Sequence, residues 1–175
     1  MPTIKYDAKN GDLKMKKLIV INGTMGVGKT TICSLLNKKL EPSVWLDADW
    51  CWKMNPWKGD EKNKRMVEDN ITHLLNNFLL NDNFQYVIFN WVLHKESIWQ
   101  TLSSKLVDTD YELHRITLLC DKEKLRERAI KDNRSPDAII KNSKNNQLSQ
   151  TQNGFKIDTT NLTIEQVVEK IMGLL

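Results

Sequence analysis

The residues best suited to chemistry lie in one short run, GTMGVGKTT, from Gly23 to Thr31. Its spacing matches GxxxxGK[ST], the signature of a phosphate-binding loop. Glycines allow backbone angles at which successive N–H groups point inward and bind an anion. Lys29 is a compact cation that can follow the β- and γ-phosphates, and the Thr30 hydroxyl is a hard oxygen ligand for Mg²⁺. The pattern predicts binding of a nucleoside triphosphate, ATP, together with Mg²⁺.

The flanking sequence gives this loop the context that it needs. An apolar run at 18–21 precedes it and a helix-like segment at 32–36 follows it, so the loop joins a strand to the start of a helix. That helix offers its positive end and its unpaired N–H groups to the same phosphate. We expect nucleotide contacts at Gly23, Thr24, Met25, Gly26, Val27, Gly28, Lys29, Thr30 and Thr31. Met25 and Val27 are expected to contribute backbone N–H groups.

Two carboxylates, Asp47 and Asp49, follow the next apolar run of the chain. In a parallel sheet the carboxyl ends of the strands face one crevice, so both aspartates are expected to face the phosphate loop. One carboxylate can hold Mg²⁺, and the other can orient an attacking hydroxyl or accept its proton. The alternative is an aspartate-rich turn at a strand end that has no part in the chemistry.

Arg128 and Arg134 are the arginines predicted to act on the phosphate groups. Transfer of a γ-phosphoryl group spreads negative charge over its oxygens, and a planar guanidinium group matches that charge. Such an arginine contributes on the order of 10³–10⁵ in rate. The polar, turn-rich stretch at about 132–150 is suited to a lid that closes over the phosphates. The alternative is that both arginines are solvated surface charges.

Four features in this order resemble the small P-loop kinases of the shikimate, gluconate and nucleotide kinase group, and chloramphenicol phosphotransferase is similar. They are GTMGVGKTT, Asp47-Ala-Asp49, Leu125-Arg-Glu-Arg128 with Arg134 beyond it, and Ile157-Asp-Thr-Thr-Asn161. The resemblance covers about residues 15–175.

The resemblance implies a role for each matching position. Asp47 would lie near Mg²⁺ and Asp49 would contact the phosphate-accepting group. The two arginines would belong to the lid, and Thr159 and Thr160 would lie beside the nucleotide base. One departure is that the third strand ends in Asn90-Trp91, without the aspartate that motor and GTPase relatives use to hold Mg²⁺. This departure, and the lack of an NKxD sequence, disfavours those two classes and shifts the metal to Asp47.

Aromatic residues follow the aspartates closely. Trp50, Trp52 and Trp57 lie in a turn-rich segment and could form a wall against a base, a sugar or a drug ring. Core packing is the alternative for these three and the favoured interpretation for Trp45 and Trp99. His94 follows the third strand and is a candidate substrate ligand, although a structural loop histidine is the other interpretation.

Apolar periodicity predicts a chain of alternating strands and helices. The expected strands are Lys17–Asn22, Ser43–Asp47, Gln85–Trp91, Glu112–Leu119 and Gly154–Asp158. The expected helices are Lys29–Leu40, Glu61–Leu80, Lys95–Val107, Lys122–Lys131 and Thr163–Met172, the last opened by a capping box. Together with the resemblance, this predicts an α/β, three-layer P-loop NTPase fold of the adenylate-kinase type, with a five-stranded parallel sheet in the order 2-3-1-4-5. Residues 1–14 are expected to be an extension and 15–175 the kinase domain.

The composition, the cysteines and the net charge of the chain indicate its compartment and the kinds of partner that it binds. Hydrophobic residues make up 40% of the chain and charged residues 27%, and no apolar run approaches the roughly 20 residues that span a bilayer. Three scattered cysteines predict neither a disulfide framework nor a zinc site, and the cytoplasm is the expected compartment. The net charge of +4 is spread among acidic residues, which disfavours nucleic acid as a partner.

These observations predict an ATP- and Mg²⁺-dependent phosphotransferase, either a monomer or a homodimer. Its small acceptor would be a nucleoside or nucleotide, or else a metabolite or antibiotic hydroxyl. One alternative is a nucleotide-dependent binding or switch protein with slow hydrolysis and no acceptor. Another is a polynucleotide-end kinase, which would need a basic groove.

Overall fold

Five parallel strands form one sheet in the order β2-β3-β1-β4-β5, as the sequence predicts. The structure, a computed structural model, describes residues 15–131, 133, 135 and 144–175. The strands are β1 (Lys16–Gly23), β2 (Ser43–Asp47), β3 (Tyr86–Trp91), β4 (Tyr111–Leu119) and β5 (Phe155–Asp158). Each begins and ends within one residue of its predicted position.

The helices also follow the prediction, with three differences. They are α1 (Lys29–Lys39), α2 (Glu61–Leu80), α3 (Glu96–Ser103), α4 (Lys122–Lys131) and α6 (Ile164–Met172), with a short helix at 144–149. The first difference is that α3 ends at Ser103 rather than Val107, because the chain continues in turns such as the bond from the Leu106 N–H to the Ser103 carbonyl. The other two are the 3-10 helix η1 (Ala48–Trp52) and the helix at 144–149, neither of which was predicted.

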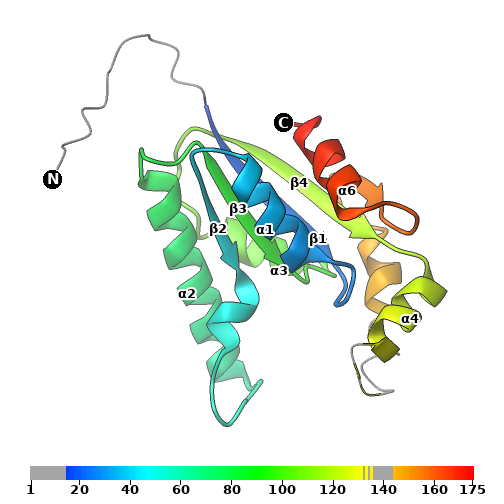
Figure 1. The fold of residues 1–175 in the computed structure, drawn as a ribbon. Helices are drawn as coiled ribbons and strands as arrows, with labels where there is room; N and C mark the ends of the chain where they lie inside the picture. Colours follow the sequence, from blue (N-terminus) through cyan, green and yellow to red (C-terminus); the bar gives the residue numbers. More distant parts are fainter. Residues whose placement is uncertain (1–14, 132, 134, 136–143) are drawn as a thin grey trace, which may run out of the picture.

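The sheet is covered on both faces, which gives the three predicted layers (Figure 1). Side chains alternate along β1, so that Ile19 and Ile21 join one apolar cluster while Leu18 and Val20 join the other. The first cluster contains residues of α1 and α6, and the second contains residues of α2 and α3. Every β1 residue from 18 to 21 is essentially inaccessible, which fixes the phosphate loop on the central strand of the fold.

The strand register brings the polar strand ends to one edge of the sheet. Asp47 of β2 lies beside Asn90 of β3, and Asn90 lies beside Ile21 of β1, shortly before the phosphate loop. The capping box predicted at Thr163 is present at the start of α6. Among the described residues, no helix combines the length and the apolar character required to cross a membrane.

Candidate active site

The phosphate loop joins β1 to α1, and its glycines take conformations that other residues rarely adopt. Gly23 has φ of 151°, and a Cβ atom there would lie 2.8 Å from both the Leu118 carbonyl oxygen and Val27 Cγ1. Gly28 has φ of 105° and is the N-cap of α1, so no side chain covers the first N–H groups of that helix. Those N–H groups and the helix dipole therefore face the loop, as an anion site requires.

Lys29 and Thr30 place a cation and a hydroxyl at the start of α1. Lys29 is only 8% exposed, and its Nζ donates a hydrogen bond of 3.1 Å to the Thr24 carbonyl within the loop. Thr30 Oγ1 donates a 2.8 Å hydrogen bond to Asp47 Oδ2, and Asp47 is 3% exposed. A hydroxyl and a buried carboxylate at this distance form a pair of hard oxygen donors, which fits Mg²⁺ shared with phosphate oxygens.

Asp49 lies in η1, and Asp47 fixes its position. The Asp49 backbone N–H donates a 3.0 Å hydrogen bond to Asp47 Oδ1, which caps η1 at its start. The Asp49 side chain is open to solvent on one side, yet partial burial of its carboxyl group raises its pKa above the ordinary value. The negative charge of Asp47 raises that pKa further, while Lys29 acts in the opposite direction. A carboxylate with a raised pKa is a stronger base, which suits it to accept a proton.

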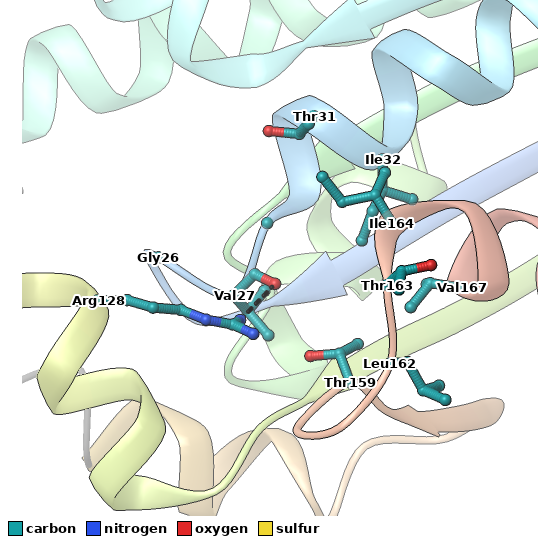
Figure 2. Close-up of a pocket in the computed structure, with 11 residues that line it drawn as sticks. Gly26, Val27, Thr31, Ile32, Arg128, Thr159, Leu162, Thr163, Ile164 and Val167 are labelled. Atoms are coloured by element: carbon teal, nitrogen blue, oxygen red, sulfur yellow. Dashed lines mark hydrogen bonds between the residues drawn. The ribbon is translucent and has the colours of Figure 1, made fainter.

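A cavity of about 260 Å³ adjoins the phosphate loop (Figure 2). It is lined by Gly26, Val27, Gly28, Thr31, Ile32, Arg128, Thr159, Leu162, Thr163, Ile164 and Val167. Arg128 extends from α4 to the loop, where its Nη1 donates a 3.5 Å hydrogen bond to the Val27 carbonyl (Figure 2). The connection from β5 to α6 forms the opposite wall. The phosphate loop, Arg128 and the segment of Thr159, which was predicted to lie beside the nucleotide base, therefore line the same cavity.

One predicted residue does not line the cavity. Thr160 is not among the lining residues; its hydroxyl accepts a 2.8 Å bond from the Asp121 N–H and donates to Asp158 Oδ1. Its neighbour Thr159 lines the cavity and donates its hydroxyl to the Leu119 carbonyl. Arg134 lies outside the described residues, as do 136–143 of the predicted lid and the N-terminal residues 1–14.

The aromatic residues after β2 form two pairs. The rings of Trp45 and Trp50 lie 4.9 Å apart, and those of Trp52 and Trp57 lie 6.0 Å apart. Trp45 is half-buried, and its Nε1–H donates a 2.6 Å hydrogen bond to Asn90 Oδ1. The amide that replaces the missing third-strand aspartate therefore orients this ring.

Trp99 and His94 lie in and before α3. Trp99 is buried in the core, with the Arg115 guanidinium 5.2 Å above its ring. His94 is half-buried in the connection from β3 to α3, and its backbone carbonyl accepts a hydrogen bond from Gln152 Nε2.

Asn22 is a residue of the site that sequence reasoning missed. Its Oδ1 accepts hydrogen bonds of 2.7 Å from the Gly23 N–H and from the Leu93 N–H, and its Nδ2 donates to Thr117 Oγ1. One buried amide therefore joins the start of the phosphate loop to the connection that carries His94 and to β4. The available signal was a polar residue at the end of an apolar strand, immediately before the glycines.

Comparison with known proteins places the chain in a family. A family model described as AAA domain matches residues 19–150, which is most of the chain. The chain belongs to this AAA domain family. A cytidylate kinase from Buchnera aphidicola subsp. Baizongia pistaciae (strain Bp) is 27% identical to this AAA domain chain over 90 residues. That match spans 51% of the chain but only 39% of the relative's length.

Solved structures share the fold of this AAA domain chain. The Deinococcus radiodurans tunicamycin resistance protein superposes with a TM-score of 0.68 at 22% identity, covering 91% of this chain and 95% of its own. A gluconokinase from Sinorhizobium meliloti 1021 has a TM-score of 0.67 at 12% identity, with 91% of each chain covered. Shikimate kinase from Aquifex aeolicus vf5 has a TM-score of 0.61 at 18% identity, over 90% and 94%. The predicted resemblance to small P-loop kinases is confirmed.

Proposed function

We propose that this chain is an ATP- and Mg²⁺-dependent phosphotransferase that moves the γ-phosphoryl group to a hydroxyl of a small molecule. The observation that carries the proposal is the 2.8 Å hydrogen bond from Thr30, in the phosphate loop and helix, to Asp47, at the end of β2. It joins the nucleotide-binding element to the strand end that positions Asp49. A donor site and an acceptor site therefore meet at one edge of the sheet.

Each residue of the site is assigned one role in phosphoryl transfer. The acceptor oxygen attacks the γ-phosphorus, the bond to the oxygen that bridges the β- and γ-phosphates breaks, and ADP leaves with that oxygen. Asp49 accepts the proton of the attacking hydroxyl, which its raised pKa favours. Lys29 and Arg128 hold and neutralise the transferring phosphate. Mg²⁺ would be held by Thr30 and Asp47 and would neutralise charge on the phosphate oxygens.

The nucleotide base is proposed to lie in the cavity between Arg128 and the β5–α6 connection, against Thr159. Thr160 supports that connection through Asp121 and Asp158 rather than facing the base. The aromatic residues after Asp49, and His94, are proposed to lie on the acceptor side. Arg134 keeps its predicted role in the lid.

The relatives agree with this class of reaction. The protein matched by sequence is named a cytidylate kinase, and two of the structural matches are named a gluconokinase and a shikimate kinase. Their acceptors differ in kind, so the acceptor of this chain is left open between a nucleoside or nucleotide and a metabolite or antibiotic hydroxyl.

The test is ADP release from Mg²⁺-ATP, measured in a coupled assay across a panel of nucleosides, nucleoside monophosphates, sugar acids and hydroxyl-bearing antibiotics. We expect at least one compound to raise turnover well above the rate without acceptor, and Lys29→Ala to abolish the increase. If folded protein binds ATP but no compound raises turnover, the phosphotransferase proposal is wrong. A nucleotide-dependent protein partner would then support a switch protein instead.

A further inference from the structure

An exposed tryptophan ring follows η1, the short helix that carries Asp49. Trp57 is 66% exposed, and its ring centroid lies 6.0 Å from that of Trp52, with an angle of 37° between the ring planes. Trp52 is half-buried and packs against the apolar cluster shared with α2 and α3. Trp52 therefore anchors the pair to the core, and Trp57 presents its ring to solvent.

The chain leaves space for the Trp57 ring at Gly59. A Cβ atom at Gly59 would lie 2.6 Å from Cη2 of the Trp57 ring and 3.2 Å from its Cζ2. The backbone of Gly59 is not in the left-handed region, so its conformation does not demand glycine. A side chain at Gly59 would instead displace the indole ring, which covers the Gly59 backbone.

Hydrogen bonds hold residues 58–60, which follow Trp57, at the start of α2. Asp60 caps α2 by accepting a 2.9 Å bond from the Asn63 N–H, and Asn63 Nδ2 donates to the Lys58 carbonyl. The ring of Trp57 is thus held between Gly59 and Trp52 on an anchored loop. Holding an aromatic ring in place before binding lowers the entropic cost of stacking on it.

The geometry of η1 relates this ring pair to Asp49. Side chains three residues apart eclipse one another in a 3-10 helix, so Trp52 and Asp49 point to the same side of η1. The Trp52–Trp57 ring pair and Asp49, the proposed proton acceptor, consequently lie on one side of η1. Large exposed apolar surface beside convergent polar groups marks a ligand site.

We propose that the acceptor carries a planar unsaturated ring that stacks on Trp57 while its hydroxyl reaches Asp49. This inference rests on the proposed function, because Asp49 is the proposed proton acceptor. A nucleobase and the aromatic ring of an antibiotic share this chemistry, and the arms of the experiment separate them. A ringless polyol acid would leave the ring of Trp57 unused.

The test compares variants in steady-state kinetics and in tryptophan fluorescence. The compounds are cytidine, cytidine monophosphate, chloramphenicol and gluconate. The variants are Trp57→Leu, which removes the ring, and Gly59→Ala, whose methyl group displaces it. Phe155→Leu is the matched control, because Phe155 is an exposed aromatic residue on β5, away from the site. Thermal unfolding establishes that each variant is folded.

We expect one ring-bearing compound to be the best acceptor and to quench tryptophan fluorescence without ATP. Trp57→Leu and Gly59→Ala should raise KM for that compound about fivefold or more, since stacking of one base contributes at least that much. KM for ATP should stay within about twofold, and Phe155→Leu should change neither value. Trp57→Leu should also remove the quenching.

The two proposals fail in different ways. If gluconate is the best acceptor, or if both site variants keep the wild-type KM for a ring-bearing acceptor, the ring inference is overturned while phosphotransfer stands. If a ring-bearing compound quenches Trp57 but no compound releases ADP, the ring site stands and phosphotransfer fails. If neither quenching nor ADP release occurs with any compound, both are wrong.

Discussion

At the scale of single residues, the two aspartates after β2 differ in burial and therefore in chemistry. Asp47 is almost inaccessible and is occupied by the Thr30 hydroxyl and the Asp49 N–H. Asp49 is more open, and burial of its carboxyl group and the charge of Asp47 raise its pKa. Asp47 thus has a structural role in the site, and we propose that it also holds Mg²⁺ while Asp49 exchanges a proton.

Asp49→Asn keeps the size of the side chain but removes the proton acceptor. We expect transfer to the acceptor to fall by about 10²–10⁴-fold, the usual contribution of a positioned general base. ATP affinity should change little, because the substitution leaves the loop and Lys29 intact. Calorimetry gives the affinity and ADP release gives the rate. Asp110→Asn, in an exposed loop, is the matched control, and full activity of Asp49→Asn would refute the assignment.

The pH dependence of transfer follows from the same carboxylate. Only the ionised form of Asp49 accepts a proton, so kcat/KM should fall as the pH drops through its pKa. Since that pKa is raised, the fall should begin at a higher pH than for an ordinary aspartate. Asp47→Asn removes a negative neighbour and lowers the Asp49 pKa, so the fall should move to lower pH, whatever the loss of rate. An unmoved profile in Asp47→Asn would contradict the coupling.

At the scale of elements, the sequence was enough to predict β1 and β3 because each contains a run of buried apolar residues. The same holds for α2, whose buried residues Val67, Ile71, Leu75 and Leu79 recur at helical spacing. The end of α3 and the presence of η1 were not predictable in this way. η1 depends on one side-chain bond, from the Asp49 N–H to Asp47, and its five residues are too few for a periodic pattern.

The site was predictable to the extent that its chemistry is local. The phosphate loop and the two aspartates carry their own spacing signals, and Arg128 does lie against the loop. The apolar lining from α6 and the residues just before it was not predictable, because Leu162, Ile164 and Val167 look like ordinary core residues in sequence. Only packing of α6 beside α1 brings them to the cavity.

An ion pair fixes α3, which follows the connection that carries His94. Arg115 of β4 makes a bidentate contact with Glu96 of α3, at 2.6 and 2.8 Å, and its guanidinium lies over Trp99. The bond from Arg115 lowers the Glu96 pKa below 4.5. We expect Glu96→Gln to lower the free energy of unfolding by about 1.5–3 kcal/mol at neutral pH, as for hydrogen bonds to charged groups.

The sign of the pH effect on that stability is fixed by the lowered pKa. The advantage of the wild type over Glu96→Gln should be fully present above pH 4.5 and should be lost as the pH falls through the lower folded pKa of Glu96. Denaturant unfolding at several pH values measures it. Glu61→Gln, which removes an exposed pair with Lys64, is the control and should have no measurable effect. Equal losses in the two variants at neutral pH would contradict the role of Glu96.

At the scale of the whole molecule, one sheet brings three parts of the candidate site to one edge. The central strand β1 delivers the phosphate loop, β2 delivers the carboxylates, and α4 and the start of α6 enclose the cavity (Figures 1 and 2). Buried layers on both faces keep these elements fixed relative to one another, while the residues that would contact substrates lie at the strand ends. The fold therefore separates stability, in the two apolar clusters, from chemistry, at the carboxyl edge.

Isothermal titration calorimetry with Mg²⁺-ATP tests the central claim most directly, because every later step requires a nucleotide in the phosphate loop. We predict saturable heat at one site per chain for the wild type and no saturable heat for Lys29→Ala, with both proteins folded by circular dichroism. Folded wild-type protein that produces no saturable heat, or a Lys29→Ala variant that binds as well as the wild type, would contradict the account.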